Sequence, residues 1–169
     1  SRKIHKGVAG QLRITGGQAR GRPLPGSVGV GVRPTSSRVR EALFSMVGQD
    51  LTGMRVLDAY GGSGVLALEA WSRGGDVVVF ERSPKTVRAI EQVVKFFKAS
   101  IVVRRGDVEG SSDQMEAFDL VMADPPYARD PLEVAGRLER RVGHCLVLET
   151  APGHDLPEVI GGLRLVRHR

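Results

Sequence analysis

The feature that most restricts how this chain can fold is an apolar run, Phe118–Ala123, that ends abruptly in an acid and two prolines. A short apolar run bounded by residues that break regular structure is typical of a parallel strand buried on both faces. Neither proline can donate to a sheet, so the backbone must leave the sheet directly after Asp124. Open α/β sheets bind their ligands in the crevice at the carboxyl ends of the strands. We therefore expect Asp124 and Tyr127 to lie at the mouth of a site.

The tetrapeptide Asp124-Pro125-Pro126-Tyr127 predicts a rigid notch that is rich in hydrogen-bond acceptors. The two prolines have a fixed φ and no N–H, so the nearby carbonyls face outward without a competing donor. A carboxylate and a carbonyl can together accept both hydrogens of a planar NH₂ group, and an adjacent aromatic side chain can stack on the ring that carries it. The amino group of a nucleobase fits this description best. The alternative is an ordinary strand end followed by a proline turn.

A glycine turn follows another predicted strand, Arg55–Tyr60. Gly61-Gly62-Ser63-Gly64 leads from this strand into a predicted helix from Val65 to Arg73. Strand, glycine turn and helix form the front of a nucleotide-binding βαβ unit. The spacing matches neither phosphate-binding glycine motif and no lysine follows the turn, so a pyrophosphate is not the expected ligand. Asp58 near the strand end favours a cationic or amine-bearing ligand, whereas the alternative is a purely structural turn.

Acids also follow the next two predicted strands. Val77–Phe80 ends at Glu81, seventeen residues beyond Gly64, where a carboxylate can accept from both hydroxyls of a ribose. Asp107 follows the strand Ile101–Val103, where it could meet an adenine amino group or could simply form a turn. The other predicted elements are helices at about 37–47, 84–98 and 131–141 and strands at 145–148 and 163–167.

Positive charge is concentrated at the N-terminus. The net charge is +6, and the first forty residues hold nine Lys and Arg and no acid. A glycine-rich segment of one charge sign predicts an arm that contacts phosphates, and a solvated tail is the alternative for the first ten residues. The predicted helix that follows places Arg38 and Arg40 off its apolar stripe, where they could face the mouth of the site.

Length and composition set further limits. A chain of 169 residues can form one domain with a real core. It contains no apolar run of membrane-spanning length and no signal-peptide pattern, so we expect a cytoplasmic protein. The single cysteine, Cys145, can form neither an internal disulfide nor a cysteine-based metal cluster, and we expect it to be a small buried hydrophobe. No metal site is expected.

Three acids after three successive strands, a glycine turn without a phosphate-binding lysine, and Asp-Pro-Pro-Tyr after the fourth strand together resemble the class I S-adenosylmethionine-dependent methyltransferases that modify exocyclic amino nitrogens. More narrowly, the chain is similar to the bacterial small-subunit (16S) ribosomal RNA guanine-N2 methyltransferase family. That resemblance covers about Leu12 to Glu149. It depends on the runs Leu12–Gly17, Arg33-Pro34-Thr35, Arg38–Phe44 and Leu57–Gly64.

The resemblance implies a Rossmann-like α/β domain in residues 33–169, with a mostly parallel sheet and helices on both faces, preceded by a basic RNA-binding arm in residues 1–32. It implies that a monomer transfers a methyl group from S-adenosylmethionine to a guanine N2 of 16S ribosomal RNA, naked or in an assembling small subunit. The implied cofactor-binding residues are Asp58, Tyr60, Gly61, Gly62, Ser63, Gly64, Glu81, Arg82, Asp107, Val108 and Asp124. The implied catalytic residues are Asp124, Pro125, Pro126 and Tyr127. The implied RNA-binding residues are Arg13, Arg20, Arg22, Arg33, Arg38 and Arg40.

The sequence departs from the family pattern in two places. Gly61 stands where the family usually has Ala, which adds backbone freedom near the cofactor. The family fold finishes with an antiparallel pair of strands, whereas this chain leaves residues for only one, whose edge would be exposed. The alternative functions are DNA adenine-N6 or cytosine-N4 methylation and a catalytically silent RNA-binding domain. Carbon-5 methylation of cytosine needs a thiolate, and Cys145 is predicted to lie away from the notch.

Overall fold

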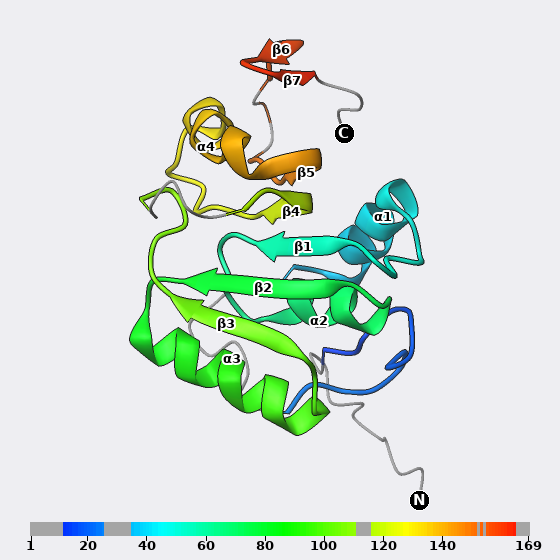
Figure 1. The fold of residues 1–169 in the computed structure, drawn as a ribbon. Helices are drawn as coiled ribbons and strands as arrows, with labels where there is room; N and C mark the ends of the chain where they lie inside the picture. Colours follow the sequence, from blue (N-terminus) through cyan, green and yellow to red (C-terminus); the bar gives the residue numbers. More distant parts are fainter. Residues whose placement is uncertain (1–11, 26–34, 111–115, 152, 154, 165–169) are drawn as a thin grey trace, which may run out of the picture.

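The computed structural model describes residues 12–25, 35–110, 116–151, 153 and 155–164. Its centre is a five-stranded sheet in the order β3-β2-β1-β4-β5, in which every neighbouring pair is parallel (Figure 1). The strands are β1 (Arg55–Asp58), β2 (Asp76–Glu81), β3 (Ile101–Arg105), β4 (Phe118–Ala123) and β5 (Val142–Leu148). Because the strands are parallel, their carboxyl ends share one edge of the sheet, which we call the carboxyl edge.

The helices α1, α3 and α4 begin at capping residues that the sequence supplies. Ser36, Ser83 and Asp130 each accept a hydrogen bond from a backbone N–H in the first turn of the helix that follows. Such caps satisfy N–H groups that have no partner within the helix. The helices are α1 (Ser37–Val47), α2 (Val65–Ser72), α3 (Pro84–Phe97) and α4 (Pro131–Leu138), and α4 continues into the 3₁₀ turn η1 (Glu139–Arg141). No helix in these described ranges is long and apolar enough to cross a membrane.

Alternating side chains of the strands pack into two separate cores. In β4, Leu120 and Met122 point into a core shared with α1, α2 and α3, whereas Val121 and Ala123 point into a core shared with α4. Helices therefore cover both faces of the sheet, as expected for a doubly wound fold. Burial on both faces explains why β4 reads as an unbroken apolar run.

The described part of the predicted N-terminal arm contributes to the first of these cores. Ile14, Ala19 and Leu24 are each no more than 2% exposed. An isolated antiparallel bridge joins Arg13 to Pro23 and closes this segment into a compact loop. Residues 12–25 therefore stabilise the fold in addition to carrying positive charge. The predicted domain boundary at residue 32 lies outside the described residues.

The C-terminal prediction of a single strand from Leu163 was wrong, because two short strands form there. β6 (Val159–Ile160) and β7 (Leu163–Arg164) pair antiparallel in a separate two-stranded sheet. Gly161 between them has φ +56, a left-handed conformation that glycine adopts without strain and that lets the chain reverse in two residues. The hairpin stands apart from the main sheet (Figure 1), so β5 is the outermost strand of that sheet within the described residues.

Candidate active site

The glycine turn lies at the carboxyl edge, between β1 and α2. Gly62 (φ +60) and Gly64 (φ +79) have left-handed backbone conformations that a side chain would strain. A Cβ on Gly61 would lie 2.7 Å from Ile90 Cδ1 and 2.9 Å from Val79 Cγ1. Glycine at position 61 is therefore matched to the tight packing of this turn against β2 and α3.

Asp58 ends β1 directly beneath this turn and is only 2% exposed. Its Oδ2 has no hydrogen-bond partner among the described residues. Burial, and then the negative charges of Asp124 and Glu81, raise the pKa of Asp58 to about 8. A buried oxygen without a donor costs free energy, and a cation or an amine would satisfy it.

Glu81 ties the end of β2 to the same turn. Its Oε2 accepts from the Gly62 N–H at 3.1 Å, and its Oε1 accepts from the Ser83 N–H at 3.0 Å. These contacts hold the Glu81 carboxylate at the end of β2, beside the glycine turn. The neighbouring Arg82 is exposed.

Asp124 and the two prolines lie at the end of β4, beside β1. The Asp124 carboxylate accepts a hydrogen bond from Thr35 Oγ1 at 3.3 Å. Its negative charge contributes to the raised pKa of Asp58. Pro125 is buried, whereas Pro126 is exposed and Tyr127 is 57% exposed. The structure thus gathers three acids at one edge of the sheet, with an aromatic side chain at the surface nearby. Asp58 and Glu81 are the last residues of β1 and β2, and Asp124 directly follows β4.

A second polar cluster at this edge was not expected from the sequence. Glu109 accepts from the Tyr60 hydroxyl, and Arg129 Nη2 lies 2.9 Å from each oxygen of the Glu109 carboxylate. Burial, and then the hydrogen bond to Glu109, raise the pKa of Tyr60. The predicted Asp107 is exposed and accepts from the Glu109 N–H, while Val108 is buried. This cluster joins the loops that follow β1, β3 and β4.

Arg40 was predicted to bind RNA, and the structure corrects this assignment. Its side chain is 1% exposed, and its Nη1 donates to Glu69 Oε2 at 2.9 Å and to the Arg13 carbonyl at 2.8 Å. Glu69, itself fully buried, also accepts from Thr15 and from Arg73 Nη1. Arg40 therefore belongs to a buried ionic cluster and cannot reach a phosphate.

The other predicted RNA-binding arginines divide between two regions. Arg38 is exposed in the first turn of α1, close to Thr35 and hence to Asp124. Arg20 and Arg22 are exposed beside the last residues of α2 and α3, and Arg22 lies over the Phe97 ring at 4.5 Å. Because these helices run back from the carboxyl edge, Arg20 and Arg22 lie at the opposite edge. Arg33 falls outside the described residues.

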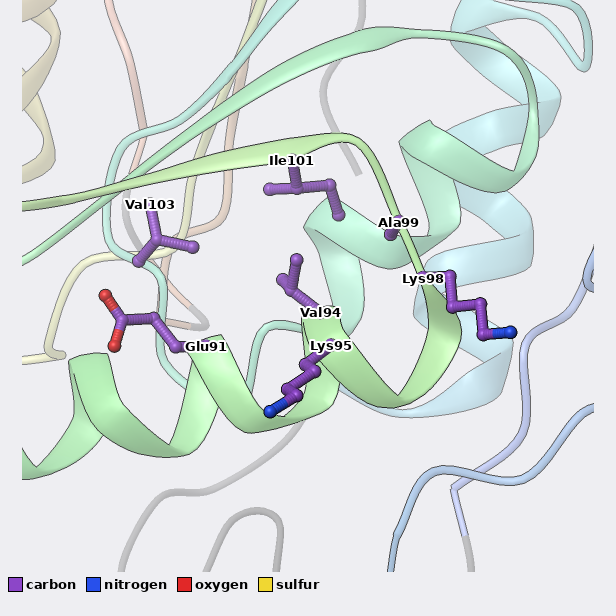
Figure 2. Close-up of a pocket in the computed structure, with 7 residues that line it drawn as sticks. All are labelled: Glu91, Val94, Lys95, Lys98, Ala99, Ile101 and Val103. Carbon is purple, nitrogen blue, oxygen red and sulfur yellow. The ribbon is translucent and has the colours of Figure 1, made fainter.

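An open pocket of about 550 Å³ lies between α3 and β3, and the acid that lines it is Glu91 (Figure 2). Val94, Ile101 and Val103 give it an apolar floor, and Lys95 and Lys98 extend from its rim. None of the predicted site residues lines it. Within the described ranges, no group of three or more His, Cys, Asp or Glu side chains could hold a metal ion.

The chain matches, over residues 12–169, the family model described as Conserved hypothetical protein 95. The chain belongs to this family. It is 36% identical over 137 residues to the ribosomal RNA small subunit methyltransferase D of Escherichia coli, an alignment that covers 76% of this chain and 66% of that protein. It is 30% identical over 171 residues to YlbH of Bacillus subtilis, which is provisionally named as an rRNA methyltransferase. That alignment covers 92% of this chain and 91% of YlbH. The resemblance to the small-subunit ribosomal RNA methyltransferases is therefore confirmed.

Solved structures confirm the expected Rossmann-like methyltransferase fold of this family member. The E. coli protein yhhF, provisionally titled a methyltransferase, superposes with a TM-score of 0.73 at 31% identity, covering 88% of this chain and 86% of its own. A hypothetical protein of Thermus thermophilus also superposes with a TM-score of 0.73, at 32% identity, and the alignment covers 92% of this chain and 94% of that protein. The five parallel strands with helices on both faces agree with this assignment.

Proposed function

We propose that this protein transfers a methyl group from S-adenosylmethionine to the exocyclic N2 amino group of a guanine in 16S ribosomal RNA. The observation that carries the proposal is the gathering of Asp58, Glu81 and Asp124 around the glycine turn. Asp58 and Glu81 are the last residues of β1 and β2, Asp124 directly follows β4, and the negative charges of Asp124 and Glu81 raise the pKa of Asp58. The names of the relatives agree with an activity on ribosomal RNA.

The residues around the turn fit S-adenosylmethionine. The buried Asp58 oxygen without a donor suits its amino group, and Glu81 can accept from its ribose hydroxyls. The left-handed glycines allow close approach of the backbone. When bound, this cofactor supplies a methyl group on a positively charged sulfur. The residues proposed to hold it are Asp58, Tyr60, Gly61, Gly62, Ser63, Gly64, Glu81, Arg82, Asp107, Val108 and Asp124.

The Asp124 carboxylate is proposed to accept a hydrogen bond from the target amino group while the rigid prolines hold a carbonyl beside it. Accepting these hydrogens aligns the nitrogen lone pair, so that transfer depends on proximity and orientation and needs no covalent nucleophile. Tyr127 is exposed, and its proposed role is to stack on an extruded base. Cys145 is half-buried in β5, and burial raises the pKa of its thiol, which disfavours the thiolate that carbon-5 methylation requires.

The residues proposed to contact RNA are Arg33 and the exposed cations Arg13, Arg20, Arg22 and Arg38. The proposed substrate is naked 16S RNA or an assembling small subunit, and the protein is proposed to act as a monomer. Basic side chains on opposite edges of the sheet imply an RNA that extends across the protein beyond the target base.

The deciding experiment is transfer of tritiated methyl groups from S-adenosylmethionine to 16S RNA and to small subunits that lack this modification, followed by nucleoside analysis. N2-methylguanosine is the expected product. Methylated adenine or cytosine would overturn the base assignment. Cofactor binding without any transfer to 16S RNA would point to another methyl acceptor such as DNA, whereas a lack of cofactor affinity would point to a silent RNA-binding domain.

A further inference from the structure

Thr35 brings the N-terminal part of the chain into contact with the candidate active site. It lies just before Ser36, the residue that caps α1, and its Oγ1 donates to Asp124 Oδ2 at 3.3 Å across 89 residues of sequence. Thr35 is partly buried, so the hydrogen bond is shielded from water in part. One of the two Asp124 oxygens is thereby engaged by a donor from the residue that precedes the α1 cap.

The backbone of Thr35 is held in place by Arg40. Arg40 Nε donates to the Thr35 carbonyl at 3.1 Å, and Arg40 Nη1 donates to Glu69 Oε2 at 2.9 Å. Arg40 and Glu69 are 1% and 0% exposed, so their charges depend on each other and on their hydrogen-bond partners. Thr15 Oγ1 and Arg73 Nη1 also donate hydrogen bonds to the Glu69 carboxylate, at 2.7 and 3.1 Å.

A fully partnered buried ionic cluster has little freedom to rearrange. Moving one member would leave a buried charge without its partner, which is strongly destabilising. The cluster therefore fixes Arg40, Arg40 fixes the Thr35 carbonyl, and the Thr35 hydroxyl reaches Asp124. These contacts form a continuous connection from the inside of the fold to the end of β4.

We infer that Thr35 is a positioning residue for methyl transfer: its hydroxyl fixes the orientation of the Asp124 carboxylate and leaves Oδ1 to accept from the target amino group. This role rests on the proposed function, because it concerns the same carboxylate. A carboxylate free to rotate would spend part of its time in orientations that do not align the amino lone pair, which lowers the rate of transfer more than the affinity for RNA.

The test compares Thr35→Val, Thr35→Ser and Ser36→Ala. Valine keeps the shape of Thr35 without the hydroxyl, and serine restores the hydroxyl. Ser36→Ala removes the cap of α1 and leaves Thr35 in place, so it controls for a general loosening of the helix. We expect Thr35→Val to lower kcat about tenfold, with KM for RNA and the cofactor Kd changed less than about twofold. Thr35→Ser should recover most of the rate, and Ser36→Ala should lower Tm without lowering kcat.

A second readout does not depend on activity. The ¹³C NMR signal of the Asp124 carboxyl should shift in Thr35→Val and stay in place in Ser36→Ala. Wild-type kcat in Thr35→Val, or a loss confined to KM, would overturn the positioning role while leaving the proposed function intact. A wild-type protein that binds the cofactor and methylates no form of 16S RNA would overturn the proposed function and the positioning role with it.

Discussion

Asp58→Asn should change how the stability of the ligand-free protein depends on pH. The pKa of Asp58 is raised from an ordinary value of 3.8 to about 8, so the folded protein keeps a proton that the unfolded chain has released. The stability that this proton contributes is complete below about pH 3.8 and is lost as the pH rises toward 8. The limiting slope is about 1.4 kcal/mol per pH unit, which gives a ceiling of about 3 kcal/mol between pH 5.5 and 7.5.

Within this ceiling we expect a loss of about 1 to 2 kcal/mol over this interval, or about 2 to 8 °C in Tm for a chain of this length. The assay is thermal unfolding of the wild type and Asp58→Asn at both pH values without cofactor. Between pH 5.5 and 7.5 the free energy of unfolding should fall in the wild type. In Asp58→Asn the fall should be smaller by about 1 to 2 kcal/mol. Asp76→Asn, at an exposed acid in β2, is the matched control and should behave as the wild type.

Adding S-adenosylmethionine should raise the Tm of the wild type by more at pH 7.5 than at pH 5.5, because its amino group pairs with the charged carboxylate. The same pH dependence in the wild type and in Asp58→Asn would refute the reasoning, since it would mean that Asp58 is already ionised in the folded protein.

Asp124→Ala should abolish methyl transfer while leaving the cofactor Kd within a few-fold of the wild type; calorimetry and a transfer assay on the same preparation check this, and wild-type turnover would contradict it. Cys145→Ser should keep activity and lose at most about 1 kcal/mol in chemical unfolding, because its side chain is only half-buried; an inactive variant that still folds would instead support a thiol mechanism. Replacing both Arg20 and Arg22 by Gln should flatten the log–log dependence of RNA affinity on salt by roughly 1.4, at roughly 0.7 per phosphate contact on single strands, with cofactor binding retained. An unchanged slope would place the RNA on the α1 side, near Arg38.

The parts of the fold that sequence predicts well are those with local physical causes. Pro84 and Pro131 follow capping residues and begin helices, and the strand ends at Asp58, Glu81 and Ala123 fall at or near their predicted positions. Caps and prolines act on the residues next to them, so their effect can be read without knowledge of the tertiary structure. The gathering of the acids could also be predicted, because the carboxyl ends of parallel strands lie at the same edge of the sheet.

Features that depend on distant packing could not be predicted in this way. Arg40 lies off the apolar stripe of α1, a position that normally faces water. It is buried because residues 12–25 cover that side of the helix and because Glu69 on α2 supplies the opposite charge. Similarly, nothing in the sequence spacing pairs Glu109 with Arg129, since their contact depends on how the loops after β3 and β4 meet.

The buried ionic cluster also sets an order of events during biosynthesis. Thr15 is separated by 54 residues from Glu69 and by 58 from Arg73. At about 5 to 20 residues per second, roughly 3 to 12 seconds pass between the synthesis of the N-terminal segment and that of its last partner. In that interval Ile14 and Leu24 cannot yet pack against α2, and Arg40 cannot pair with Glu69 until α2 has been made. Residues 12–25 must therefore wait for α2 before they can take their place in the fold.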